Sequence, residues 1–407
     1  MTFPKTVHIT NSYHPTSGGI STFYRALMRT ATEQGRQIRL IVPGEATRIE
    51  QVSDLARIYY LAAKATFIGD ARYKLLWAWG PTGSLIKQIL RDEEPDLVEF
   101  ADKYTTPYLA GLLRKGWVKG MSKKPILVAT SHERMDDIMR LYMGIPGPAQ
   151  WFSRLYMRSF YFAMFDWHIA NSEYTAEELF PASIGHRLYR EIRVLSMGVD
   201  CDAFHPRNRT DEARAKLIRR AGVTPGATLL LYVGRLAREK NLDLLVELLG
   251  NLPGEYVLVI AGEGEFRSHL EQQIGGRARF LGHLRDREEM AATLAGADIF
   301  VHPNPTEPFG IAPLEAMAAG LPVVGPASGG ILSYANTENA WLGPAEPKAF
   351  ASAIRSINHN AQERAQKTGR AREMAERFCW PRVAARFFEF FDEAVTRGFP
   401  PRSNVNR

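Results

Sequence analysis

The segment 297–320 constrains the fold of this chain most tightly, because it reads as a strand, a rigid loop and a helix in immediate succession. Residues 297–302 form an apolar run of the kind found in buried strands. Three prolines then fix φ within the loop. Residues 314–319 have helical composition, and Gly320 is a natural helix stop. A strand–loop–helix unit of this kind indicates an α/β fold.

Two carboxylates flank the start of that helix. Glu307 lies in the loop and Glu315 lies inside the helix, while Gly310 between them permits close backbone approach. The loop and the helix N-terminus face the carboxyl end of a sheet, where α/β folds bind anions. Carboxylates do not bind phosphate, so we interpret them as acceptors for sugar hydroxyl groups. The alternative is an ordinary turn whose glutamates are solvated.

The rest of the chain repeats the alternation of strands and helices, which predicts an α/β protein. The predicted strands are 7–10, 38–42, 96–100, 126–130, 167–170, 193–195, 228–233, 256–261, 278–281, 299–301 and 322–324. The predicted helices include 20–34, 84–93, 242–249 and 373–397, the last broken at Pro381. The first loop is not Gly-x-Gly-x-x-Gly, which argues against a dehydrogenase.

Glycines and cations follow several of these strands. Gly18 and Gly19 precede the first helix, where backbone N–H groups can meet an anion. Arg235 and Lys240 follow the strand 228–233. Fixed cations there would stabilise the charge that develops on a diphosphate leaving group. Taken singly, each motif also fits a plain turn or a solvated basic loop.

Taken together, the segments resemble the family-4 glycosyltransferases of the GT-B fold. The matching segments are 18–19, 131–134, 171–175, 198–206, 234–241, 262–264 and 306–320. The resemblance implies two Rossmann-like doubly wound domains that face each other across a cleft. It places an acceptor-side domain at 1–197 and a nucleotide-sugar domain at 198–379. A C-terminal helix at about 380–407 would pack back on the first domain.

The resemblance also implies roles for individual residues. Glu315 would bind the ribose hydroxyls, while Glu307 and the backbone N–H groups after it would hold the donor sugar. His132, in a loop after a buried strand, would lie beside that sugar. The catalytic candidates are therefore His132, Arg235, Lys240 and Glu307. The donor-binding candidates are Gly18, Gly19, Gly234, Arg235, Lys240, Gly262, Gly264, His283, Glu307, Phe309, Gly310, Ile311, Leu314 and Glu315.

The implied activity is transfer of a hexosyl unit from a nucleoside-diphosphate sugar to an acceptor hydroxyl, with retention of anomeric configuration. No metal and no cofactor are expected; Asp200-Cys201-Asp202 resembles a metal motif but has no third ligand in view. A nucleotide-sugar epimerase or phosphorylase, or an inactive sugar-nucleotide binding protein, remains an alternative. No motif names the base, the sugar or the acceptor.

Charge and cysteine content bear on partners and compartment. The net charge is +7, and residues 103–132 carry six cations without an acid. No nucleic-acid motif accompanies them, so we expect a sugar, lipid or small-molecule acceptor and leave peripheral contact with an anionic membrane open. We interpret the aromatic run 151–162 as core packing, with a membrane seat as the alternative. Two isolated cysteines and no apolar leader or membrane span predict a cytoplasmic protein.

Overall fold

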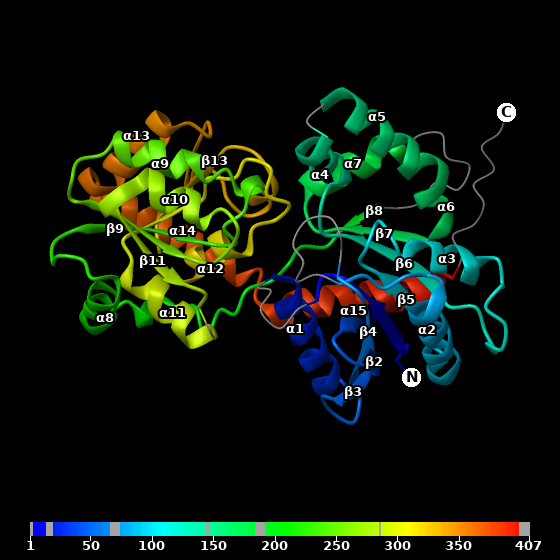
Figure 1. The fold of residues 1–407 in the computed structure, drawn as a ribbon. Coiled ribbons are helices and arrows are strands. Elements are labelled where there is room, and N and C mark those ends of the chain that lie inside the picture. Colours follow the sequence, from blue (N-terminus) through cyan, green and yellow to red (C-terminus); the bar gives the residue numbers. More distant parts are fainter. Residues whose placement is uncertain are drawn as a thin grey trace. The chain divides into compact units, whose positions relative to one another are not determined.

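The chain divides into two compact units in the computed structural model (Figure 1). Unit 1 comprises Met1–Ser196 and Pro381–Arg407, and unit 2 comprises Met197–Trp380. The predicted boundaries lie one residue from these. The structure describes residues 3–13, 19–65, 74–143, 146–183, 192–284 and 286–398.

Unit 1 is built on an eight-stranded sheet with the order β3-β4-β2-β1-β5-β6-β7-β8. Neighbouring strands are parallel except β3 and β4. The strands are β1 (Thr6–Ile9), β2 (Ile38–Gly44), β3 (Arg48–Gln51), β4 (Ala56–Ala62), β5 (Leu97–Phe100), β6 (Ile126–Ser131), β7 (Trp167–Ala170) and β8 (Ile192–Val194). The helices are α1 (Gly19–Glu33), α2 (Gly80–Glu93), α3 (Pro107–Arg114), α4 (Met135–Met143), α5 (Pro146–Tyr156), the π-helix η1 (Met157–Tyr161), α6 (Phe162–Met164) and α7 (Glu173–Ser183).

The C-terminal helix α15 (Trp380–Arg397) completes unit 1. Side chains alternate along β1, so Val7 and Ile9 face the core shared with α2 and α3, while His8 faces the other way. The ring of His8 lies 5.5 Å from that of Phe391 in α15. Arg36 also donates two hydrogen bonds of 2.8 Å to Asp392. The part of the C-terminal helical region that follows the break, α15, therefore belongs to unit 1, as the resemblance implied.

Unit 2 is built on a six-stranded parallel sheet with the order β11-β10-β9-β12-β13-β14. Its strands are almost wholly apolar because helices cover both faces (Figure 1). The strands are β9 (Thr228–Val233), β10 (Tyr256–Ala261), β11 (Ala278–Gly282), β12 (Ile299–Val301), β13 (Val323–Pro326) and β14 (Trp341–Gly343). The helices are η2 (Pro206–Asn208), α8 (Asp211–Ala221), η3 (Arg238–Lys240), α9 (Asp243–Gly250), α10 (Arg267–Ile274), η4 (Gly275–Arg277), α11 (Arg287–Gly296), α12 (Ile311–Ala318), η5 (Gly330–Ser333), α13 (Pro347–His359) and α14 (Ala361–Glu376).

Both sheets are doubly wound, which confirms the predicted class. In unit 2 the chain enters at β9, builds outward through β10 and β11, and then returns to the other side of β9 with β12. The loops after β9 and β12 therefore leave the sheet in opposite directions, and this switch point is where open α/β sheets bind ligands. In unit 1 the corresponding strands are β1 and β5.

The two segments where the chain crosses between units lie side by side in unit 2. The amide of Val199 donates to Phe378 O at 2.9 Å, and the amide of Trp380 donates to Val199 O at 3.1 Å. Cys201 and Cys379 form a disulfide beside this pairing, with their Cα atoms 5.6 Å apart. The expectation of two isolated cysteines was therefore wrong, and it no longer supports a reducing compartment. The sequence separation of 178 residues concealed the pairing.

The aromatic run 151–162 is the second correction. Met157, Tyr161 and Phe162 are buried as predicted, but Trp151, Phe152, Leu155 and Phe160 are exposed. The run therefore has an apolar face toward the core and a second apolar face toward solvent. In the part of the chain that the structure describes, no helix is long and apolar enough to span a bilayer.

Candidate functional site

Several of the predicted site residues of unit 2 gather at the switch point between β9 and β12. Lys240 ends η3 in the loop after β9, and Glu307 lies in the loop after β12. Lys240 Nζ donates to Glu307 Oε1 at 3.1 Å and to Oε2 at 2.8 Å. The structure thus joins two candidates that the sequence places in separate motifs.

Glu307 is held as a carboxylate by its surroundings. Burial raises its pKa, but the neighbouring Lys240, His302 and Asn304 outweigh burial and hold the pKa at about 2. Asn304 donates through Nδ2 to Glu307 Oε2 at 3.0 Å. An ionised, oriented carboxylate can accept hydrogen bonds from hydroxyl groups across the whole physiological pH range.

Arg235 has a different partner. Its guanidinium is paired with Glu239, four residues further on in the same loop. Both candidate cations therefore carry a carboxylate partner, Glu239 for Arg235 and Glu307 for Lys240. A diphosphate at this site would share or replace these partners, so the effective charge offered to it is smaller than two free cations would give.

The glycines of this edge have a steric role that the sequence does not reveal. A Cβ on Gly262 would lie 1.9 Å from Gly234 O, and one on Gly264 would lie 2.1 Å from Leu236 O. The loops after β9 and β10 therefore pack backbone against backbone. Gly262 and Gly264 are needed for this packing whether or not they contact a ligand, while a Cβ on Gly234 would instead lie 2.7 Å from the hydroxyl of Tyr232.

The start of α12 offers backbone N–H groups. Gly310 precedes the helix with φ +82° and provides no side-chain cap. Its carbonyl and that of Phe309 accept hydrogen bonds from the hydroxyl of Tyr334, the latter at 3.2 Å. This anchoring leaves the first-turn amide of Ile311 at a helix N-terminus, where an anion is favoured. Leu314, also a donor-binding candidate, is fully buried beneath this turn.

Glu315 sits in a different electrostatic environment from Glu307. Burial raises its pKa to about 8; Arg287 opposes this effect and Asp200 adds to it. No hydrogen bond joins Glu315 to Glu307 within the described residues. Burial, and then both carboxylates, raise the pKa of the Tyr334 hydroxyl, so both carboxylates lie within electrostatic range of this one tyrosine.

Three residues at this edge were missed by sequence reasoning. Tyr334 lies beyond the segment 297–320, after β13 and η5, and no local pattern in the sequence marks it as a site residue. His302 is buried at the end of β12, and burial lowers its pKa to about 4. Asn304 lies inside the motif, and its place between two prolines was the signal that it has a structural role. His283, in contrast, was predicted here but lies exposed after β11, two strands from β9.

The candidates of unit 1 lie at the carboxyl edge of its own sheet. Gly18 is outside the described residues, and Gly19 is the first residue of α1. His132 directly follows β6, and its ring meets that of Phe23 at 5.8 Å. Both ring nitrogens are buried and have no hydrogen-bond partner among the described residues. Burial lowers the pKa of His132 to about 4, with Lys103 acting in the same direction and Glu99 against it.

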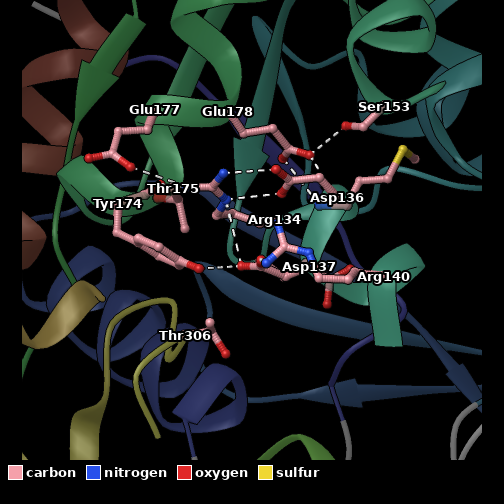
Figure 2. A network of polar contacts seen from close by, with 12 residues as sticks. Arg134, Asp136, Asp137, Arg140, Ser153, Tyr174, Thr175, Glu177, Glu178 and Thr306 are labelled. Carbon is pink, nitrogen blue, oxygen red and sulfur yellow. Dashed lines mark hydrogen bonds and ion pairs between the residues drawn. The ribbon is translucent and has the colours of Figure 1, made fainter. Parts of the chain in front are cut away.

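A buried carboxylate fixes the segment that follows His132 (Figure 2). Glu178 in α7 accepts hydrogen bonds from the amides of Met135 and Asp136, at 3.1 and 2.9 Å, and from Ser153 Oγ at 2.6 Å. Lys103 Nζ lies 2.7 Å from Glu178, and both side chains are almost inaccessible. The start of α4 is therefore tied to α7 and to the loop after β5.

Charged residues just beyond His132 are engaged within the same network. Arg134 pairs with Asp136 at 2.8 Å and stacks on Tyr174 at 4.5 Å, while the Tyr174 hydroxyl donates to Asp137 (Figure 2). Their observed partners make them a rigid support for the loop that carries His132.

The comparisons with known proteins agree with this architecture. The model described as Glycosyltransferase Family 4 matches residues 17–203, and the model described as Glycosyl transferases group 1 matches residues 214–374. A GDP-mannose-dependent alpha-(1-6)-phosphatidylinositol dimannoside mannosyltransferase of Mycobacterium tuberculosis is 30% identical over 94% of each chain. A D-inositol 3-phosphate glycosyltransferase of Xylanimonas cellulosilytica is 27% identical over 94% of this chain and 93% of its own.

Solved structures give the same fold. A sucrose-phosphate synthase from Thermosynechococcus elongatus superposes with a TM-score of 0.79 at 19% identity, covering 97% of this chain and 100% of its own. Anabaena HepE, solved with UDP and glucose, superposes with a TM-score of 0.70 at 19% identity, covering 95% and 99%. The fold is thus GT-B, and the chain is a glycosyltransferase of family 4.

Proposed function

We propose that this glycosyltransferase moves a mannosyl unit from GDP-mannose to a hydroxyl group of an inositol-containing glycolipid, with retention of anomeric configuration. The observation that carries the donor and acceptor is the 30% identity, over 94% of both chains, to a mannosyltransferase whose name gives both substrates. The D-inositol 3-phosphate glycosyltransferase also points to an inositol-bearing acceptor.

The switch-point residues of unit 2 support a nucleoside-diphosphate sugar as donor. The bond between the anomeric carbon and a diphosphate oxygen breaks, and negative charge grows on the diphosphate. Lys240, Arg235 and the start of α12 would stabilise that charge. Glu315 would accept hydrogen bonds from the ribose hydroxyls, and Glu307 from hydroxyls of the sugar.

In a single displacement, retention requires the acceptor oxygen to attack from the side on which the diphosphate leaves. In this front-face reaction the acceptor hydroxyl passes its proton to a departing diphosphate oxygen, so no protein base is needed. His132, neutral because of its low pKa, would offer a hydrogen bond near the donor sugar rather than a proton. No metal is invoked, and the charge on the leaving group is met by side chains and backbone amides.

A labelled-donor assay tests the proposal. Radiolabelled GDP-mannose, UDP-glucose and ADP-glucose are each incubated with phosphatidylinositol mannosides, with D-inositol 3-phosphate, or with no acceptor. We expect transfer from GDP-mannose to the lipid, and a product that an α-mannosidase hydrolyses and a β-mannosidase does not. Preference for another donor would show that GDP-mannose is the wrong donor, and preference for D-inositol 3-phosphate would show that the lipid is the wrong acceptor. Release of free sugar alone would leave no transferase activity to explain.

A further inference from the structure

The segment α5–η1 presents an apolar face to solvent, opposite the face that it buries. Ala149, Ser153 and Met157, spaced four residues apart, are buried, and Ser153 is bonded to Glu178. The helix is therefore seated on unit 1 through this side. A surface helix seated in this way normally carries polar residues on its outer side.

The outer side of this segment carries large hydrophobic residues instead. Trp151 is 65% exposed and Phe160 is 57% exposed, while Phe152 and Leu155 are each 46% exposed. Together the four form the outer apolar face of α5–η1. The ring of Phe160 lies roughly parallel to that of Tyr156, with their centroids 6.4 Å apart. Four such side chains within ten residues exceed the scattered exposure that an ordinary surface shows.

The charge around this face has one sign. From Ile138 to Phe165 the chain contains no acidic residue and three arginines. Arg154 and Arg158 are exposed among the apolar side chains, and neither has an acidic partner among the described residues. Aromatic and aliphatic side chains interleaved with unpaired arginines match the interface of an anionic bilayer, where rings enter the headgroup zone and cations meet lipid phosphates.

The basic span 103–132, which first suggested contact with a membrane, is less well suited to binding an anionic bilayer. Of its six cations, Lys103 is buried with Glu178, Arg114 pairs with Asp166 and Lys123 pairs with Asp96. Only Lys115, Lys119 and Lys124 are left without an acidic partner within the described part of the chain. Exposed Trp117 is engaged by Lys115 Nζ at 4.8 Å. Three of the six cations are therefore already paired with carboxylates of unit 1.

We infer that the outer apolar face of α5–η1 is a docking surface for anionic phospholipid bilayers. Trp151, Phe152, Leu155 and Phe160 enter the interfacial zone, and Arg154 and Arg158 meet the lipid phosphates. The proposed acceptor would then be presented to unit 1 from the bilayer on which the protein sits. The docking itself depends on neither the donor nor the reaction.

Vesicle co-sedimentation tests the inference with the full chain and no donor, so the result is independent of the proposed function. The vesicles are phosphatidylcholine alone or phosphatidylcholine with phosphatidylglycerol. We expect binding to the anionic vesicles only, weakened by salt. Trp151→Ser combined with Phe160→Ser, and separately Arg154→Gln combined with Arg158→Gln, should each lower the partition coefficient by about tenfold or more.

Matched controls separate this face from other exposed apolar residues. Trp117→Ser removes a ring that is also 65% exposed, and Leu332→Ser removes a residue of unit 2 that is 50% exposed. Both should bind vesicles as the wild type does. If Trp117→Ser abolishes binding and the α5–η1 variants do not, the surface is the basic span and the inference is wrong.

Hydrogen–deuterium exchange provides a readout without substitution. Anionic vesicles should slow exchange in peptides that cover residues 146–161, because docking excludes water from the helix. The outer face has one further possible occupant, a second copy of the chain. Concentration-dependent dimerisation that Trp151→Ser removes, together with absence of binding to anionic vesicles, would assign the face to that second copy and overturn the inference.

Discussion

Lys240 and Glu307, 67 residues apart in the chain, form a salt bridge in which Nζ lies 2.8 Å from Oε2. The bridge spans the switch point of the unit 2 sheet, because one residue follows β9 and the other follows β12. The bridge holds a cation and an ionised carboxylate side by side at this switch point. Under the proposed function, Lys240 would meet the diphosphate and Glu307 the sugar hydroxyls.

The first prediction concerns the two cations. Lys240→Ala and Arg235→Ala should each lower kcat by about 10²-fold or more, because a fixed charge aimed at the leaving group acts mainly in the transition state. Single-turnover kinetics with labelled donor measures the effect. Arg238→Ala is the control, since Arg238 is exposed in the same short helix η3. Near wild-type rates in both test variants would remove the cations from the mechanism.

The second prediction separates the two carboxylates. Glu315→Ala should weaken binding of GDP, because the ribose contacts are present with or without the sugar. Glu307→Ala should leave GDP affinity nearly unchanged and reduce sugar transfer. Isothermal titration calorimetry with GDP, alongside the transfer assay, measures both. Unchanged GDP affinity in Glu315→Ala would make the ribose assignment wrong.

The third prediction follows from the pKa of Glu315, which burial raises to about 8. The folded state holds this proton more tightly than the unfolded chain, whose glutamates titrate near 4.3. The contribution of this bound proton to the unfolding free energy is therefore fully present below about pH 4.3 and is lost as pH rises through 8. Glu315→Gln should be close to wild type in unfolding free energy at pH 4.5 and more stable at pH 8.5. Urea denaturation at the two pH values measures the difference, and an equal difference at both would contradict the buried proton.

The fourth prediction concerns His132. Its pKa is lowered to about 4, so the ring is neutral throughout the usual assay range. Any loss of kcat/KM that comes from protonating this ring should appear only as pH falls toward 4. His132→Ala should lower kcat and should not remove any inflection between pH 6 and 7. An inflection near pH 6.5 that vanishes in this variant would show that the ring titrates normally.

The fifth prediction concerns the disulfide between Cys201 and Cys379. Because it closes a long loop, its removal should lower the unfolding free energy of unit 2 by about 2–5 kcal/mol. Cys201→Ser should lower the melting temperature, and dithiothreitol should lower that of the wild type but not of the variant. Mass spectrometry after thiol alkylation provides the control. Two free thiols in the protein purified without reductant would show that the bond does not form under those conditions.

Much of the fold was predictable because local patterns suffice for it. Strands such as 228–233 and 256–261 are almost wholly apolar, as expected for parallel strands in a sheet that helices cover on both faces. The break at Pro381 was also predictable, since proline cannot occupy a helix interior; the structure has α14 end at Glu376 and α15 begin at Trp380. The glycine-rich and charged motifs of the site were also found from the sequence, because each consists of residues that are neighbours in the chain.

The amino-acid sequence by itself determined the class of fold, the order of most strands and helices, and the positions of the charged and glycine-rich loops, because these depend on neighbours in the chain. The strands β3, β4 and β14 were not predicted. Only the tertiary structure decided which of these groups meet. It joined Lys240 to Glu307, buried Lys103 against Glu178, brought Cys201 to Cys379 and turned Trp151 and its neighbours outward. Each of these outcomes depends on contacts between segments far apart in the chain, and a pattern read along the chain does not record such contacts.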